Sequence, residues 1–286
     1  MLLRVLAQVI AVIALMLIVG LVVVVGRDRL GETRREYLSR LRAVAPIALV
    51  LATTLALNGV VRGASYDLSW IVGWEATWTI YELEGQFIVW IQSLATPPVT
   101  AYFSFMYVYG YVFLLVFPIV AYFALADTRP LRLLFASYTF NYVLGLVCYT
   151  LVIAYGPRNV MPELVSSLLY ESYPHYQHLT RQVNRNVNVF PSLHTSLAAT
   201  AAILAYRTRD VYPRWTPVAI VLAVSVAIST MYLGIHWATD VVAGVALAYA
   251  SVVLADRLVG RVSLASLVGS RLEGTPIAAY LARLRR

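Results

Sequence analysis

The chain has 286 residues, of which 60% are hydrophobic and 13% are charged, and its formal net charge is +8. Soluble domains are about half apolar and about a quarter charged, so this composition excludes a water-soluble globular protein and predicts a membrane protein. The positive charge comes from arginine alone, because the chain contains no lysine. The arginines cluster between apolar runs, which favours the charge bias of membrane topology over nucleic-acid binding.

Seven apolar stretches reach or approach the roughly 20 residues that cross a bilayer as a helix. They lie near 3–25, 43–61, 100–125, 131–155, 191–206, 216–235 and 238–256. The first is longer than the roughly 7–15 apolar residues of a signal peptide, so we expect a retained helix. The sequence therefore predicts an all-α, polytopic membrane helical bundle, with a six-helix core and one extra N-terminal transmembrane helix.

The chain divides into three regions on this interpretation. Residues 1–42 hold the N-terminal transmembrane helix and an arginine-rich loop, residues 43–257 hold the core, and residues 258–286 form a basic tail. Within the core, tryptophans and acidic residues recur at helical spacing over 66–95. This pattern predicts an amphipathic helix that lies in the membrane interface.

The arginine positions predict the topology. Arginines occur in the connection after the first span, in two short loops and in the tail; the short loops hold Arg129 and Arg132, and then Arg207, Arg209 and Arg214. With seven spans all four segments fall on one side, which the positive-inside rule makes the cytoplasm. We therefore expect an integral cell-membrane protein with its N-terminus outside and its C-terminus in the cytoplasm. Segments 62–99, 156–190 and 235–237 then lie on the outer side.

The first polar cluster on the outer side is Phe190–Pro191–Ser192–Leu193–His194. Proline is favoured at the first position of a helix, and a helix start offers free N–H groups that suit an anionic phosphate. Ser192 adds a hydroxyl group and His194 adds a titratable ring. Taken alone, this cluster also fits an ordinary helix start with an interfacial histidine.

The second cluster is His236–Trp237–Ala238–Thr239–Asp240. The i, i+4 spacing places His236 and Asp240 on one helix face. A carboxylate bonded to one ring nitrogen fixes the histidine tautomer and leaves the other nitrogen available as a nucleophile or base. A hydrogen-bonded pair without chemistry is the alternative, and a second histidine cluster on the same side weakens it.

The third cluster is Tyr155–Gly156–Pro157–Arg158, where the fourth span ends. An arginine there can bind phosphate with two parallel hydrogen bonds, or its side chain can extend to the lipid headgroups. His175 and His178 lie in the same outer segment, and we interpret them as loop residues. No Cys/His spacing predicts a zinc site. The few arginines on the outer side are Arg4, Arg62, Arg158, Arg181 and Arg185.

The first two clusters, separated by one helix, resemble the second and third signatures of the type-2 phosphatidic acid phosphatase superfamily. The resemblance covers residues from roughly 100 to 256. It implies an all-helical fold that needs no metal or other cofactor. It also implies that His236 attacks phosphorus to form a phosphohistidine, that Asp240 orients this ring, and that His194 protonates the leaving oxygen.

Two features depart from that family's pattern. Its third signature carries an arginine six residues before the histidine, where this chain has Thr230. Its first signature, a lysine followed seven residues later by Arg-Pro, is absent, and Arg129–Pro130 falls on the predicted cytoplasmic side. We therefore expect Arg158, Arg185 and Ser192 to bind phosphate, with Arg185 compensating for Thr230.

The shortened signatures are most similar to the inositol phosphorylceramide synthase branch, which passes a phospho-headgroup between lipids. We expect a lipid phosphatase or phosphotransferase that acts on a phospholipid at the outer leaflet, with membrane lipids but no nucleic acid as partners. Hydrolysis or transfer, and the oligomeric state, stay open. The alternative is a non-catalytic lipid-binding or scaffolding protein with a degenerate site. A transporter fits less well, because the ionisable residues cluster at one face and not at mid-bilayer.

Overall fold

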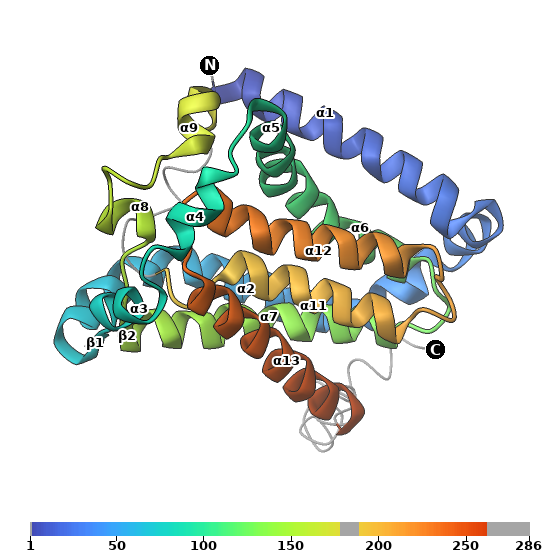
Figure 1. Ribbon diagram of the computed structural model, residues 1–286. Coiled ribbons are helices and arrows are strands. Elements are labelled where there is room, and N and C mark those ends of the chain that lie inside the picture. Colours follow the sequence, from blue (N-terminus) through green and yellow to red (C-terminus); the bar gives the residue numbers. More distant parts are fainter. Residues whose placement is uncertain (1, 178–188, 262–286) are drawn as a thin grey trace.

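Helices make up nearly all of the computed structural model, which describes residues 2–177 and 189–261 (Figure 1). Two strands of two residues each form a short parallel pair. The long elements are α1 (Leu2–Gly20) with η1 (Leu21–Val25), α2 (Arg27–Val72), α5 (Pro97–Phe105) with η2 (Met106–Gly110) and α6 (Tyr111–Phe123), α7 (Arg129–Leu151), α11 (Leu193–Arg207), α12 (Trp215–Tyr232) and α13 (Ala238–Arg261). The short elements are β1 (Trp74–Glu75), α3 (Thr77–Glu84), α4 (Phe87–Ser93), β2 (Val152–Ile153), α8 (Pro157–Val160), α9 (Leu168–Ser172) and η3 (Pro174–Tyr176).

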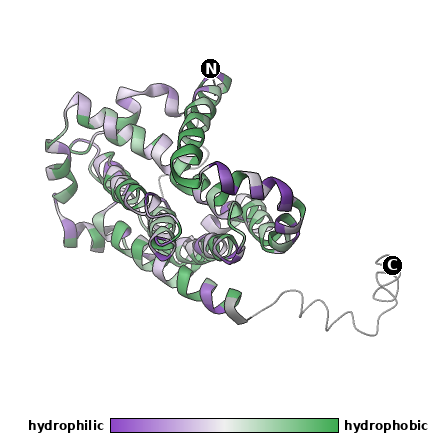
Figure 2. Ribbon diagram, turned by 90° about the vertical axis from the view of Figure 1, so that its right-hand side faces the viewer, coloured by the Kyte–Doolittle hydropathy of each residue, from purple (hydrophilic) through white to green (hydrophobic). Residues whose placement is uncertain are grey.

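Six helices in the described part are long and apolar enough to cross a membrane, which confirms the prediction of a polytopic all-α bundle. The long helices are mostly hydrophobic, and hydrophilic residues gather at their ends and turns (Figure 2). The predicted span at 191–206 is α11, which has 15 residues. At 1.5 Å per residue it is about 22 Å long, shorter than the roughly 30 Å hydrocarbon core. It lies inside the bundle, packed against α12, α13 and α7.

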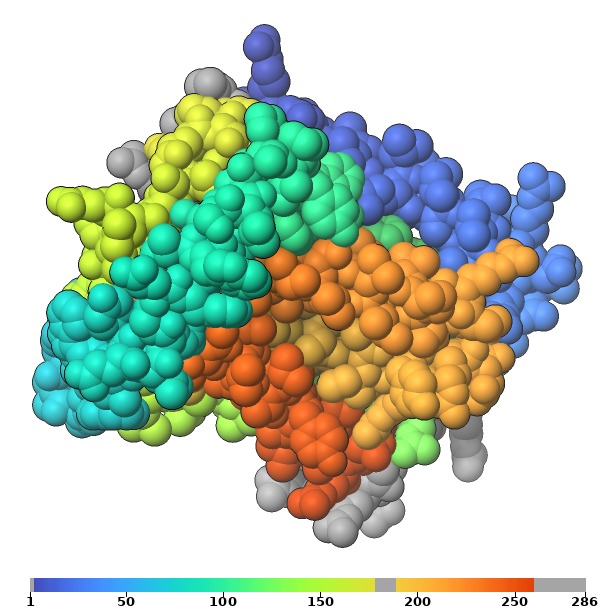
Figure 3. Space-filling model, in the orientation of Figure 1, coloured from blue at the N-terminus to red at the C-terminus, as the bar shows by residue number. Residues whose placement is uncertain are grey.

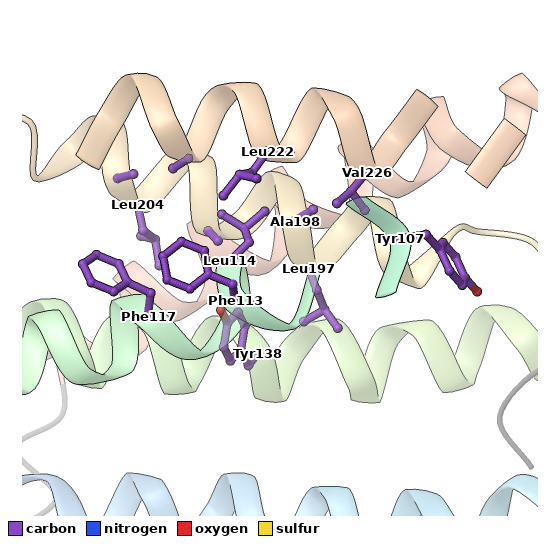
Figure 4. Packing of buried hydrophobic residues seen from close by; sticks show 14 of the residues in the cluster. Tyr107, Phe113, Leu114, Phe117, Tyr138, Leu197, Ala198, Leu204, Leu222 and Val226 are labelled. Atoms are coloured by element: carbon purple, nitrogen blue, oxygen red, sulfur yellow. The ribbon is translucent and has the colours of Figure 1, made fainter. Parts of the chain in front are cut away.

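The core is formed where α6, α7 and α12 pack around α11 (Figure 4). Aromatic and leucine side chains of α6, such as Leu114 and Phe117, are fully buried against it. The facing side of α11 carries small residues, including the buried Ala198 and Ala201, which let neighbouring helices approach closely. On α13, a Cβ at Gly244 would lie 2.6 Å from the Ser192 carbonyl oxygen, so glycine is required there. This contact holds the N-cap of α11 against the second turn of α13.

The prediction of an arginine-rich loop before residue 43 is wrong. Helix α2 runs without interruption over Arg27–Val72, 46 residues. Residues 27–42 are mainly arginine, glutamate and leucine, which favour a helix, and Asp28 in the first turn complements the helix dipole. The pair Glu36–Arg40, at 2.8 Å with i, i+4 spacing, supports the same stretch.

The prediction of one interfacial helix over 66–95 is also wrong. Helix α2 ends at Val72, and Gly73 has extended backbone angles (φ −79°, ψ 150°) that lead into β1. Gly85, at φ 54°, then separates α3 from α4. Strand β1 pairs with β2, so this segment is held to the end of α7. In the space-filling view it covers the neighbouring ends of α12 and α13 (Figure 3).

The described arginine-rich segments meet at one end of the bundle. Arg29 donates to the carbonyl oxygen of Val211 at 3.3 Å, and Arg214 donates to that of Val23 at 3.1 Å. Arg129 pairs with Asp256 at 3.3 Å. We call this the arginine-rich end and the opposite one the site end. Assignment of the arginine-rich end to the cytoplasm stays a prediction, and the tail from residue 262 lies outside the described residues.

Candidate active site

His236 lies in the turn between α12 and α13. Gly234, at φ 72°, allows the turn, and the N–H groups of Ile235 and His236 both donate to the Thr230 carbonyl oxygen, at 3.0 and 3.1 Å. The Nδ1 atom of His236 lies 3.2 Å from Oδ2 of Asp240, which is fully buried. The structure thus brings the predicted pair together, but not on one helix face as the i, i+4 spacing predicted, because His236 precedes the start of α13 at Ala238. Nε2 is the ring nitrogen that Asp240 does not engage.

The first turn of α13 is held by residues that the sequence did not identify. Glu84, at the end of α3, accepts the N–H groups of Ala238 and Thr239, the first at 2.9 Å. The indole N–H of Trp237 donates to the carbonyl oxygen of Tyr155 at 2.8 Å. Helix α3 and the loop after β2 therefore hold the turn that carries His236.

His194 lies in the first turn of α11, between two aromatic rings. The centroid of its ring is 4.8 Å from that of Tyr107 and 4.5 Å from that of Tyr111. Tyr107 belongs to η2, a π-helical segment of the kind often found at functional sites. In the same segment, the hydroxyl of Tyr109 lies 2.9 Å from that of Tyr176 and accepts a hydrogen bond from Gln8. This network ties η2 to α1 and η3.

Ser192 has a different role from the predicted one. Its hydroxyl oxygen accepts the N–H of Thr195 at 3.3 Å, which makes Ser192 the N-cap of α11. The side chain is fully buried and does not line the cavity that contains the histidines. We therefore correct the expectation that Ser192 binds phosphate, since its hydroxyl is used to start the helix that carries His194.

Arg158 is placed beside the His236 turn by the loop after β2. Its N–H donates to the Gly234 carbonyl oxygen at 3.2 Å, and a Cβ at Gly156 would lie only 2.5 Å from the Ile235 carbonyl oxygen. The guanidinium lies over the ring of Tyr170, with 5.2 Å from Cζ to the centroid. Its Nη1 is buried and has no hydrogen-bond partner among the described residues. A buried donor without a partner is costly unless a ligand satisfies it.

One cavity of about 230 Å³ joins these groups, with His194, His236 and Arg158 in its wall. Asp240 lies behind His236, and Arg185 lies outside the described residues. The sequence missed Arg62 from α2 as a wall residue, although the topology had placed it among the few arginines on the outer side. It also missed three tyrosines and two asparagines that complete the polar wall: Tyr111, Tyr142, Tyr149, Asn58 and Asn159.

The charge of this cavity suits an anion. Two arginines and two histidines line it, and none of its described lining residues is an aspartate or a glutamate. Arginine binds phosphate oxygens with charge-assisted hydrogen bonds, and no described carboxylate in the wall competes with a phosphate for these arginines. Among the described residues, two imidazole rings and two guanidinium groups thus share one cavity at the site end of the helical bundle.

Comparison with known families agrees with this class of site. A sequence model of the PAP2 superfamily matches residues 69–254, which is more than half of the chain. The chain therefore belongs to the PAP2 superfamily, the type-2 phosphatidic acid phosphatase superfamily whose signatures it resembles. Comparison with curated proteins gave no match. Comparison with solved structures gave none either.

Proposed function

We propose that this protein is a lipid phosphatase or phosphotransferase that acts through a phosphohistidine at His236. The observation that carries the proposal is the contact of His236 with Asp240, together with the opening of the same ring into a cavity shared with His194 and Arg158. Membership of the PAP2 superfamily supports a phosphoester substrate. The site needs no metal in this proposal, because a histidine supplies the nucleophile and arginines bind the phosphate.

The first half-reaction transfers the phosphoryl group to the enzyme. Nε2 of His236 attacks phosphorus while the bond from phosphorus to the leaving oxygen breaks. Asp240, bonded to Nδ1, stabilises the positive charge that develops on the ring. His194, entering in its protonated form, gives a proton to the leaving oxygen and becomes neutral. Arg158 stabilises the negative charge on the phosphoryl oxygens.

The second half-reaction returns the enzyme to its starting state. His194, now neutral, takes a proton from an incoming hydroxyl as its oxygen attacks phosphorus and the bond to His236 breaks. If that hydroxyl belongs to water, the product is a phosphate. If it belongs to a lipid alcohol, the phospho-group is transferred, as the inositol phosphorylceramide synthase resemblance suggests. We propose that this chemistry takes place at the outer leaflet, since the site end is opposite the arginine-rich end.

Trapping of a labelled enzyme tests the proposal. Purified protein in mixed micelles is incubated with phosphatidic acid carrying ³²P, or with phosphatidylinositol labelled in the same way, and quenched under alkaline conditions that preserve phosphohistidine. We expect label on the wild type and none on His236→Asn. A His194→Asn variant should turn over slowly, because it lacks the acid and base of both steps.

His175→Asn serves as the matched control, because His175 packs against Tyr173 and Tyr176 and does not line the cavity. Its activity should equal that of the wild type. Turnover by His236→Asn at the wild-type rate would rule the mechanism out. Specific lipid binding without turnover or labelling in the wild type would instead support the alternative, a lipid-binding protein with a degenerate site.

A further inference from the structure

Position 230 does not contribute to the cavity, although the family carries a phosphate-binding arginine there. The side chain of Thr230 is fully buried, and its Oγ1 donates to the Ala227 carbonyl oxygen at 2.7 Å. The Thr230 carbonyl oxygen holds the His236 turn through two hydrogen bonds. Position 230 therefore serves the backbone of the turn and supplies no cation to the cavity.

Besides Arg158, one more arginine among the described residues lines the cavity: Arg62 on α2. Asn58 donates to the Tyr142 carbonyl oxygen at 3.4 Å, and the hydroxyl groups of Ser65 and Thr150 lie 2.5 Å apart. Residues 58, 62 and 65 follow the i, i+4, i+7 spacing of one helix face, so Arg62 is on the face that contacts α7. Its Cζ lies 5.7 Å from the centroid of the Tyr149 ring.

Arg62 forms no ion pair with a carboxylate of the described residues. None of the ion pairs within residues 2–177 and 189–261 includes Arg62, and the cavity wall that it shares with Arg158 contains no acidic side chain among those residues. Two like-charged guanidinium groups in one wall repel each other unless an anion lies between them. A phosphoryl group, with up to two negative charges and three oxygens, meets that requirement.

We propose that Arg62 is the second phosphate-binding arginine of this enzyme and takes over the role of the arginine missing at position 230. The inference rests on the proposed function, because it assigns a ligand to the same phosphoryl group. Arg62 lies before the residues 69–254 that match the family, so α2 supplies this ligand from outside the matched region. Its guanidinium binds two phosphoryl oxygens, and these contacts strengthen as phosphorus becomes five-coordinate.

Kinetics and inhibition by orthovanadate, which mimics five-coordinate phosphorus, test the assignment. Arg62→Ala should lower kcat/KM by about 100-fold, the usual scale for loss of one transition-state donor, and should weaken orthovanadate inhibition by a similar factor. Guanidinium ion added to the assay should restore part of the activity of this variant. Arg62→Lys keeps the charge but not the paired hydrogen bonds, so we expect a loss of about 10-fold.

Arg4→Ala is the matched control, because Arg4 is an exposed arginine near the start of α1. It should behave as the wild type. Wild-type kinetics and orthovanadate inhibition in Arg62→Ala, with His236→Asn inactive, would overturn the role of Arg62 and leave the proposed function standing. Activity in His236→Asn would remove the proposed function itself. If Arg62→Ala does not fold, Arg62→Lys decides, and an orthovanadate affinity equal to that of the wild type overturns the assignment.

Discussion

The carboxylate of Glu84 accepts the backbone N–H of Ala238 at 2.9 Å, across 154 positions of sequence. A second hydrogen bond, from the N–H of Thr239, makes Glu84 the cap of α13. Negative charge at a helix N-terminus is stabilising, and this cap sits immediately after His236. The position of the turn that carries His236 thus depends on a residue of α3.

Removal of this cap should affect turnover more than substrate binding. We expect Glu84→Ala to lower kcat by about 10-fold with little change in KM, and to destabilise the fold by about 2 kcal/mol, the scale of hydrogen bonds to a charged group. Glu84→Gln keeps one acceptor oxygen and should recover part of kcat. Glu82→Gln, at an exposed neighbouring position, is the control. Equal kinetics for Glu84→Ala and Glu82→Gln would contradict a positioning role.

Gly156 lies where the Arg158 loop packs closely against the His236 turn. A Cβ there would lie 2.5 Å from the Ile235 carbonyl oxygen. Because this oxygen belongs to the backbone, the clash can be relieved only if the backbone moves. We expect Gly156→Ala to reduce kcat/KM by at least about 10-fold, because misplacement by about 1 Å is costly in catalysis.

Gly59→Ala is the matched control for Gly156→Ala. A Cβ at Gly59, within α2, meets no atom within 4 Å, so the substitution should be neutral for activity. It should stabilise the fold by roughly 0.5–1 kcal/mol through helix propensity. Activity assays and thermal unfolding in one detergent compare the two variants. If Gly156→Ala leaves activity unchanged, as Gly59→Ala should, then the contact of Gly156 with Ile235 is unimportant for catalysis.

Asp240 should control the tautomer of His236. Asp240→Asn presents a neutral amide to Nδ1, so the ring loses both its orientation and the partner of its developing charge. Turnover should fall by roughly 100-fold or more, with less labelled enzyme formed during the first turnover. Asp256→Asn, on the same helix at the arginine-rich end, removes the partner of Arg129 and should leave turnover intact. A similar loss in both variants would point to general damage to α13.

Chelation of divalent cations should not inhibit the enzyme. Mg²⁺ and Ca²⁺ prefer carboxylate oxygens, and none of the described side chains in the cavity wall is a carboxylate. We therefore expect full activity after dialysis against EDTA and no gain on addition of Mg²⁺. Activity that disappears with EDTA and returns with Mg²⁺ would contradict a mechanism based on histidine and arginine alone.

Composition and apolar length predicted the membrane bundle because both depend on the solvent and not on details of packing. The same approach failed for residues 27–42 and 66–95. The first stretch was predicted to be a loop because it is highly charged. Its residues nevertheless favour a helix, and Arg40 is buried against the carbonyl oxygen of Phe123. In the second stretch the tryptophan spacing suggested one helix, whereas Gly73 and Gly85 divide it.

The site was predictable where chemistry is local in sequence. His236 and Asp240 are only four positions apart, so the short spacing brought them together even though His236 lies in the turn before α13. Arg62 and Glu84 could not be found in this way, because their positions depend on how α2 and α3 pack against distant elements. Ser192 was assigned to phosphate because a helix start offers donors, but its hydroxyl is used by the helix itself.

The continuity of α2 has a mechanical consequence. Arg40 is bonded to Glu36 and to the carbonyl oxygen of Phe123, whereas Arg62 lies in the cavity wall. At 1.5 Å per residue, roughly 33 Å of one helix separates the two arginines. A displacement of the anchored end is either transmitted along this rod to the cavity or absorbed at Pro46, where a helix hydrogen bond is missing. The width of the cavity is therefore coupled to the position of Arg40 only to the extent that α2 stays rigid at Pro46.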